Sequence, residues 1–360
     1  MNPKYELGIC KFKNIDGISC YMVSILHILQ QIPHFADYII SYKFFEKIKN
    51  KVNTDRDMRN LLIIEMYRLL KTSYENDNYT ITPTSFKKLI GKKNSMWLNM
   101  EHQDSQEFLI FLISTLEEEL GEKIIYIPNI SIEKEIKIEN IFFKINGLQY
   151  LQKSQKNDFS IIKKIFIGIM INTINCKYCK TKSPCFESFI TLPLSIPINN
   201  KLNIKLYDCL NYLIRDEILD KQNMVYCSIC GLKNSSTKKT LFWKSPKVLI
   251  IQLKRFIFDL NGNISYKNNN NIEYPINDLD IKSYFHPESP FIEKSIYNLI
   301  GINIHSEIGI KNINAGHYVS IVKNRYNNQW YLFNDSHDPI LINNNLQNNE
   351  AYLLFYYRKN

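Results

Sequence analysis

Two Cys-x-x-Cys steps place the strongest constraint on how this chain can fold. Cys176 and Cys179 form the first step, and Cys227 and Cys230 form the second. Two thiolates at this spacing can hold one metal ion from a tight turn, and two such turns complete a tetrahedral Zn²⁺ site. Four thiolates leave no open position for chemistry, so the predicted site is structural and joins two separated hairpins. The alternatives are two unrelated thiol pairs or a redox-active Cys-x-x-Cys step.

The composition indicates a large folded protein inside the cell. Of 360 residues, 45% are hydrophobic and 13% aromatic, which is enough for two domains or for one elaborated domain. No apolar run approaches the roughly 18 residues of a membrane span, and the first residues lack the apolar core of a signal peptide. We therefore expect a cytoplasmic or nuclear protein with reduced thiols and no membrane partner. Cys10, Cys185 and Cys209 have no partner at a ligand spacing and are expected to be packing residues.

The charge of the chain raises the question of a nucleic-acid partner. The formal net charge is +10 and the isoelectric point is about 9.0. The basic residues are scattered, however, and no long Lys/Arg block occurs, so a solvated basic surface is favoured over a nucleic-acid footprint. A zinc-containing nucleic-acid binder remains the alternative that the charge and the cysteines would suggest.

The order of hydrophobic patterns predicts an α+β fold. From Cys20 to about Leu120 apolar residues recur at helical spacing, whereas from about Ile124 to Lys201 short runs rich in Ile, Phe and Val favour strands. A helix is expected at about 206–219, and strands thereafter, with the Asn-rich segment 259–275 as a loop or hairpin tip. Helices first and strands afterwards argue against alternating βαβ units.

Cys20 stands where a helix is expected to begin. Apolar residues follow it at offsets of three and four between positions 22 and 32. At the first turn of a helix, unpaired N–H groups and the positive end of the dipole stabilise an anion and lower the pKa of a thiol. Cys20 is therefore a candidate nucleophile. The alternative is that Cys20 is a small buried hydrophobic residue.

His317 is the candidate base for such a nucleophile. It begins a strand-like run, and a turn returns the chain as QWYLFND, so a hairpin would place Asn334 or Asp335 beside His317. A nucleophilic cysteine needs a base, and the base needs a third group that orients it. Cys, then His, then Asn is the order of papain-like proteases. The alternative is a histidine that only satisfies local hydrogen bonds.

Two further patterns contain candidate functional residues. Asp104 and Glu107 are one turn apart at the start of a predicted helix. Asp104 would cap that helix, and the pair could also form an acidic lip for a basic peptide. His305 ends a predicted strand, from which a polar loop leads to His317.

Taken together, these pieces resemble the ubiquitin-specific protease family of cysteine deubiquitinases. DGISCYMVS resembles the Cys box of the family, EHQDSQEFL its Gln-Gln-Asp box, and NAGHYVSIVKN with QWYLFND its His box. YCSICG followed by LKRF is similar to the second zinc knuckle and the next strand, and EAYLLFYYR to the closing strand. The order is that of the family, and the match runs from Cys20 to Arg358.

The resemblance implies one catalytic domain over residues 1–360, with a papain-like core shaped like a right hand. Ubiquitin would lie in the hand, and its C-terminal tail would pass between thumb and palm to Cys20. The implied parts are a helical thumb at about 14–125, zinc-bound fingers at about 165–245, and a β-rich palm at about 125–165 and 246–360.

The resemblance also implies roles for single residues. Cys20 would be the nucleophile and His317 the general base, with Asn334 at the third position and Asp335 at the adjacent acidic position. Asp104, His305 and Tyr318 match family positions that line the tail channel, and Glu107 would brace that channel.

The implied activity is thiol-dependent hydrolysis of the peptide or isopeptide bond after the C-terminal glycine of ubiquitin, by a monomer acting on ubiquitinated proteins. The alternatives are a catalytically weak ubiquitin-binding scaffold and a protease for a ubiquitin-like modifier.

The Cys box departs from the family pattern where the oxyanion should be stabilised. The family has an Asn five residues before the nucleophile, and here that position is Ile15, with Ile18 at a second common Asn position. Asn14 is one residue too far and could serve only if the turn bulges. Loss of one oxyanion donor costs about 3 kcal/mol, or 10²–10³ in rate, so impaired activity is expected.

Overall fold

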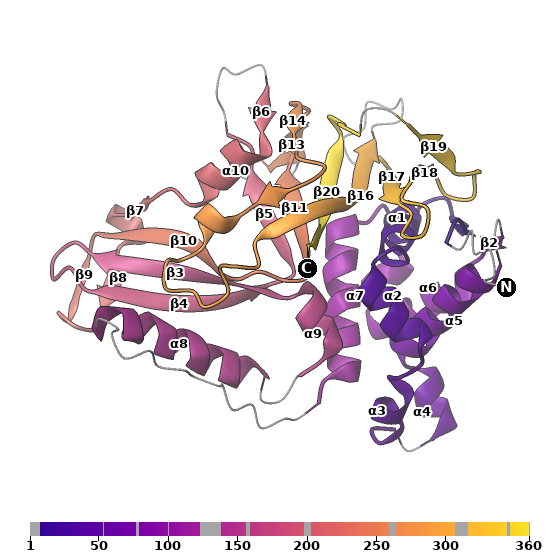
Figure 1. The fold of residues 1–360 in the computed structure, drawn as a ribbon, viewed down its shortest axis with the longest axis horizontal. Coiled ribbons are helices and arrows are strands. Elements are labelled where there is room, and N and C mark those ends of the chain that lie inside the picture. The colour runs from indigo at the N-terminus through magenta and orange to yellow at the C-terminus, as the bar shows by residue number, and fades with distance from the viewer. Residues whose placement is uncertain are drawn as a thin grey trace.

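The computed structural model describes most of the chain. The described residues are 8–52, 54–76, 79–99, 101–122, 138–155, 159–197, 203–258, 264–306, 316–343 and 346–359. Figure 1 shows three parts in a row: helices at one end, a large sheet in the middle and a long ribbon of strands at the other end. Among the described helices, none has the length and apolar character that a membrane span requires.

The helical part, here called the thumb, confirms the prediction for the first third of the chain. Its core is apolar, and Cys20, at the head of α1, belongs to it. The first strand, β1 (Lys11–Phe12), pairs with β2 (Thr80–Ile81) at its edge. The helices are α1 (Cys20–Leu29), α2 (Pro33–Ile40), α3 (Phe45–Lys49), α4 (Asp55–Arg59), α5 (Leu62–Glu75), α6 (Thr84–Lys93) and α7 (Ser105–Leu120).

The middle part, here called the palm, is one sheet in the order β19-β18-β17-β16-β20-β11-β5, with β15 paired to β16. Its neighbours are antiparallel except for the parallel pair β11 and β5. The strands are β5 (Thr191–Ser195), β11 (Val248–Lys254), β15 (Leu279–Asp280), β16 (Ile296–Ser306), β17 (His317–Lys323), β18 (Trp330–Phe333), β19 (Ile340–Ile342) and β20 (Ala351–Arg358).

The two faces of the palm are covered differently. On one face α1 packs against β16 and β17, and α9 (Ile161–Phe166) against β11, so that the thumb and the palm share one core. The other face forms a second core that includes α10 (Leu206–Leu213). The short pair β14 (Ile272–Glu273) with β6 (Ile204–Lys205) contributes to this second core. A further short pair joins β12 (Phe256–Phe258) to β13 (Ile264–Lys267), and Phe256 packs against the first core.

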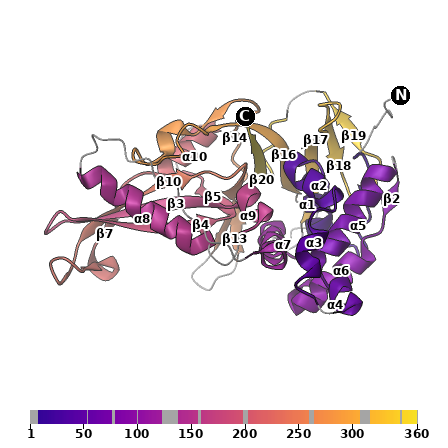
Figure 2. The same cartoon turned by 60° about the horizontal axis from the view of Figure 1, so that its bottom comes forward.

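The third part, here called the fingers, is a four-stranded sheet in the order β4-β3-β10-β7 with a separate hairpin, β8 and β9, near its tip. Figure 2 shows α8 (Ile138–Gln155) running along this sheet, as in Figure 1. The strands are β3 (Gly168–Cys176), β4 (Lys182–Phe189), β7 (Glu217–Leu219), β8 (Val225–Cys227), β9 (Leu232–Asn234) and β10 (Ser236–Lys244).

Three expectations were wrong. Of the strands expected from about Ile124 to Lys201, β3, β4 and β5 are present, and residues 123–137 lie outside the described part of the chain. The expectation was wrong at α8 and α9, because the apolar side chains of α8 pack on the fingers sheet around Trp243. The helix expected at about 206–219 ends at Leu213, and Glu217–Leu219 pairs with β10 instead. Cys185 lies exposed on β4, whereas Cys10 and Cys209 are buried as expected.

Candidate active site

Cys20 is the first residue of α1 and is almost completely buried, with 2% of its surface exposed. Burial raises the pKa of its thiol to about 11, and the negative charge of Asp335 acts in the same direction. A hydrogen bond from the backbone of Tyr318 opposes this shift. The expectation of a lowered thiol pKa was therefore wrong for the protein without substrate, since desolvation outweighs the start of the helix.

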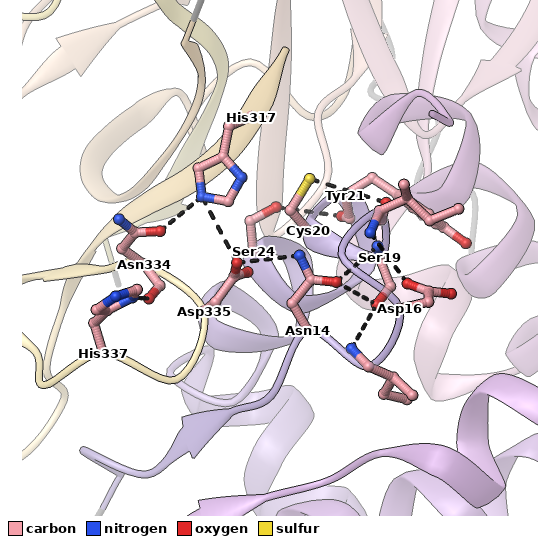
Figure 3. A network of polar contacts seen from close by, with 12 residues as sticks. Asn14, Asp16, Ser19, Cys20, Tyr21, Ser24, His317, Asn334, Asp335 and His337 are labelled. Atoms are coloured by element: carbon pink, nitrogen blue, oxygen red, sulfur yellow. Dashed lines mark hydrogen bonds and ion pairs between the residues drawn. The ribbon is translucent and has the colours of Figure 1, made fainter. Parts of the chain in front are cut away.

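His317 lies at the start of β17, opposite Ser306 of β16. Its Nε2 atom is 2.6 Å from Oδ1 of Asn334 and 3.8 Å from Oδ2 of Asp335. Figure 3 shows the other ring nitrogen pointing toward the sulfur of Cys20. Because the amide oxygen of Asn334 can only accept, this contact selects the neutral tautomer with the proton on Nε2, in which Nδ1 offers a lone pair toward the thiol.

A β-hairpin and a side-chain hydrogen bond bring the predicted residues Cys20, His317, Asn334 and Asp335 together. Asn334 directly follows β18, which pairs with β17, so the hairpin returns the amide to the imidazole. Asp335 adopts a left-handed backbone conformation with φ of 49°. Its Oδ2 accepts a hydrogen bond of 3.1 Å from Nδ2 of Asn14, a residue of the Cys20 turn. Figure 3 shows this chain of side chains from His317 to the turn.

The sequence alone does not determine whether Asn14 reaches the candidate catalytic residues. Its Oδ1 accepts hydrogen bonds from the backbone N–H and the hydroxyl of Ser19, both at 2.9 Å, while Ile15 packs against the thumb core. The turn bulges, with Gly17 in a left-handed conformation at φ 78°, and this places Asn14 beside the candidate catalytic groups. The Asp16–Gly17 dipeptide, a strong turn former, was the signal for this bulge.

An ion pair fixes the bulged turn to the thumb. Lys87 of α6 pairs with Asp16, and the side chains of both residues are largely buried. Asp16 also accepts a hydrogen bond of 3.2 Å from the backbone N–H of Ile18. Burial lowers the pKa of Lys87, and the carboxylate of Asp16 provides the counter-charge. The turn before Cys20 is therefore held by Lys87 of the thumb on one side and by Asp335 of the palm on the other.

The state of the Cys20 thiol can be tested by its pH dependence. In the substrate-free protein, alkylation of Cys20 by iodoacetamide is expected to accelerate continuously from about pH 6 to about pH 10, because only the thiolate reacts and burial raises the thiol pKa to about 11. The measurement is the rate of modification of the Cys20 peptide by mass spectrometry, with glutathione as the reference thiol. A rate that levels off below about pH 7 would instead reveal a preformed thiolate.

Asp104 caps α7, as the sequence predicts. Its Oδ1 accepts hydrogen bonds from the backbone N–H groups of Gln106 and Glu107, at 2.7 and 3.1 Å. Its Oδ2 accepts from the hydroxyls of Tyr352 at 2.7 Å and Tyr318 at 3.4 Å. One carboxylate thus joins the first turn of a thumb helix to two strands of the palm.

A cavity of about 370 Å³ opens between α7 and the palm beside these groups. Burial and the nearby charge of Asp104 raise the pKa of Glu107. Burial lowers the pKa of His305 to about 4, so its imidazole is neutral. A Cβ on Gly316 would lie 2.0 Å from Nε2 of His305, so only glycine permits this contact. The lining includes Gln103, Asp104, Glu107, Gln252, Lys254, Phe256, His305, Gly316, Tyr318 and Tyr352.

The four predicted cysteine ligands meet in the fingers. Their sulfur atoms all lie within 4.8 Å of one another, with Cys176 and Cys230 at 3.9 Å and Cys179 and Cys227 at 3.6 Å. Tetrahedral Zn–S bonds of about 2.3 Å require sulfur atoms about 3.8 Å apart, whereas a disulfide requires about 2.05 Å. The donor set and its spacing therefore fit a metal ion.

The two cysteine turns share one backbone design. Lys180 and Gly231 have φ of 59° and 68°, and each donates its N–H at 2.9 Å to the carbonyl of the first cysteine of its step. In the first turn, the backbone N–H of Cys179 donates a hydrogen bond of 3.5 Å to the sulfur of Cys176. This hydrogen bond is the main cause that lowers the pKa of Cys176 to about 6. Each turn thereby brings two sulfur atoms to the same side.

Comparisons with known proteins bear on the family of the chain. The family model described as ubiquitin carboxyl-terminal hydrolase matches residues 10–356. Ubiquitin carboxyl-terminal hydrolase Usp2 of Drosophila melanogaster is 28% identical over 359 residues, covering 98% of this chain and 35% of the fly protein. Ubiquitin carboxyl-terminal hydrolase 2 of Homo sapiens is 26% identical over 357 residues, covering 99% and 56%. The chain thus spans about a third to just over half of these relatives.

Solved structures show the same fold. The SAGA DUB module of Ubp8, Sgf11, Sus1 and Sgf73 bound to monoubiquitin matches with a TM-score of 0.72 and 25% identity, over 98% of this chain and 70% of that chain. The module bound to ubiquitin aldehyde matches with a TM-score of 0.74 and 24% identity, over 100% and 71%. Since the family model covers nearly the whole sequence, the chain belongs to the ubiquitin carboxyl-terminal hydrolase family.

Proposed function

We propose that this chain is a thiol-dependent deubiquitinase that hydrolyses the peptide or isopeptide bond after the C-terminal glycine of ubiquitin. The observation that carries the proposal is the 2.6 Å contact between His317 and Asn334, with the free imidazole nitrogen directed at Cys20. This is the arrangement that a general base requires when it activates a thiol. Membership of the family supports the choice of ubiquitin as substrate.

The chemistry follows from the protonation states. Nδ1 of His317 takes the proton of the Cys20 thiol as the sulfur attacks the carbonyl carbon, which avoids a free thiolate in the buried site. The imidazolium then protonates the leaving amine, and a thioester remains on Cys20. Water activated by His317 hydrolyses the thioester, releases the carboxylate of ubiquitin and restores the thiol. Asn334 holds the imidazole in the required tautomer throughout.

The proposed oxyanion donors are the backbone N–H of Cys20 and the side-chain amide of Asn14. The Asn14 amide has two hydrogens, of which one is donated to Asp335. The second is available for the negative oxygen of the tetrahedral intermediate. In this proposal Asp335 positions Asn14 and adds negative charge beside the imidazolium of His317.

The cavity beside Asp104 is the proposed channel for the ubiquitin tail. Asp104 and Glu107 would supply negative charge at its lip, and His305 and Tyr318 would form its wall. Because Gly316 lies against His305, a side chain at position 316 would clash with the wall of the proposed channel.

The wider proposal concerns the whole molecule. We propose that residues 1–360 act as one catalytic domain, as a monomer, on ubiquitinated proteins inside the cell, where the eight free cysteines stay reduced. The fingers would hold one structural Zn²⁺ through Cys176, Cys179, Cys227 and Cys230. A nucleic-acid partner is not part of the proposal.

The test uses ubiquitin with an electrophilic group at its C-terminus. Wild-type protein loaded with zinc is expected to gain the mass of one ubiquitin, and peptide mapping is expected to locate the bond at Cys20. Cys20→Ala is expected to form no adduct, whereas Cys185→Ala, which removes an exposed thiol, is expected to react like wild type. Tight binding of ubiquitin without adduct or turnover would instead identify a scaffold. The same reaction with probes built on ubiquitin-like modifiers would show whether the chain prefers ubiquitin or one of these modifiers.

A further inference from the structure

A second cavity, of about 270 Å³, lies at the far end of the palm from the candidate active site. Strand β17 starts at His317 and ends at Lys323, which separates the two places by about 20 Å at 3.3 Å per residue. The cavity is formed by the ends of β17 and β20, the turn at 324–328, the first half of β16 and the start of α2. Its lining residues are Gln31, Pro33, Asn298, Leu299, Ile300, Lys323, Asn324, Arg325, Asn328, Tyr357, Arg358 and Lys359.

This lining contains four cationic side chains and no carboxylate. Arg325 pairs with Asp37, and Lys359 pairs with Asp278 at 2.6 Å. Both carboxylates lie outside the lining, and their side chains are 61% and 64% exposed, so solvent weakens each pair.

The other two cations are less compensated. Nη1 of Arg358 donates to the backbone carbonyl of Ser245 at 3.2 Å. Within the part of the chain that the structure describes, no carboxylate pairs with Arg358 or Lys323. Of the four cations at the cavity, two therefore have only exposed carboxylates as partners, and two have no carboxylate partner among the described residues.

The neighbourhood of the cavity extends this positive field. Nζ of Lys247 lies 4.8 Å from the ring centre of Tyr357, which lines the cavity. The pKa of Lys247 is lowered by partial burial and then by the positive charges of Arg358 and Lys294. Several cations near one another repel, and an anion placed among them relieves that repulsion.

We propose that this cavity is a binding site for a small anion that carries two or more phosphate groups. Guanidinium groups bind phosphate oxygens in a bidentate manner, and lysines act as point charges beside them. Side-chain amides of Asn298 and Asn328 add neutral polar groups to the wall. The volume lies just below the range of about 300–1,000 Å³ for pockets of drug-sized ligands, which suits a compact polyphosphate or a phosphorylated headgroup and excludes a folded segment of protein. The proposal does not depend on the deubiquitinase activity.

The test is calorimetric titration of the full, zinc-loaded chain with sodium tripolyphosphate. We expect saturable binding of one anion per chain, which weakens as salt is raised from about 50 mM to about 200 mM. The Lys323→Gln/Arg358→Gln double variant is expected to bind at least about tenfold more weakly than wild type. Each single variant is expected to show a smaller loss of affinity than the double variant. Lys49→Gln, which removes an exposed charge on α3 of the thumb, is the matched control and is expected to bind like wild type.

The source of the phosphate groups is distinguished by vesicles. Neutral vesicles with and without a lipid that bears a bisphosphorylated inositol headgroup are tested for co-sedimentation with the same variants. Binding of tripolyphosphate alone indicates a free ligand, and binding of both indicates that a headgroup also fits; either result supports the site if the double variant weakens it. Absence of tripolyphosphate binding, an unchanged double variant, or an equal loss in Lys49→Gln would overturn the proposal.

Discussion

Replacing Asn14 by alanine is expected to lower kcat for a fluorogenic ubiquitin substrate by about 10²–10³-fold, with KM nearly unchanged. This is the usual effect of removing one preorganised oxyanion donor. The interaction forms only in the transition state, so the loss falls on kcat and not on ground-state binding. The structure motivates the prediction because the bulged turn brings the Asn14 amide to Asp335, next to His317.

The Asn14→Asp variant separates this role from a purely structural one. It keeps an oxygen that can accept the two hydrogen bonds from Ser19, but it lacks the N–H donor and places a second carboxylate beside Asp335. We expect a loss of kcat at least as large as in Asn14→Ala, with a thermal stability that falls as the pH rises to neutral, because the two carboxylates then repel each other. If either variant keeps more than about a tenth of wild-type kcat, Asn14 is not an oxyanion donor.

Replacing Cys227 by serine is expected to lower the zinc content from one ion per chain to almost none and to abolish hydrolysis of ubiquitin substrates. Binding of a structural zinc is worth on the order of 10 kcal/mol, and this energy is available only to the folded site. Without it, the hairpin β8–β9 loses the link between its Cys227–Cys230 turn and the Cys176–Cys179 turn that joins β3 to β4. The measurements are metal analysis and initial rates.

Two controls make this prediction specific. Cys185→Ser changes another thiol of the fingers, one that lies exposed on β4, and is expected to keep one zinc and full activity. In Cys227→Ser, alkylation of Cys20 by iodoacetamide is expected to keep its wild-type rate, because Cys20 belongs to the shared core of thumb and palm. A Cys227→Ser chain that retains one zinc would contradict the four-cysteine site.

Much of the architecture was predictable because long periodic segments fix their own secondary structure. The pattern of SQEFLIFLISTLEEEL predicts a helix, and α7 covers those residues. The error at 138–166 has a physical cause: Ile and Phe favour strands intrinsically, yet α8 forms because its apolar side chains are buried on the fingers sheet. Gly147 permits that contact, since a Cβ there would lie 2.3 Å from the ring of Trp243.

The grouping of the candidate residues was predictable from the sequence, and the details of their arrangement were less so. Cys20, His317 and Asn334 could be grouped because a hairpin and a helix start dictate where they lie. The position of Asn14 depends on a bulge that the Asp16–Lys87 pair holds in place, and that pair joins residues 71 positions apart. The raised pKa of Cys20 depends on burial by the whole core, which no local pattern reveals.

The cap of α7 sets a limit on how the proposed channel can recognise a substrate. A carboxylate offers about four lone-pair positions. Asp104 already fills four of them, with two backbone N–H groups on Oδ1 and the hydroxyls of Tyr318 and Tyr352 on Oδ2. Its acceptor capacity is saturated before any ligand arrives. Asp104 therefore interacts with a peptide in this channel through its negative charge alone. A peptide that donates a hydrogen bond to an acidic side chain of the channel would donate it to Glu107.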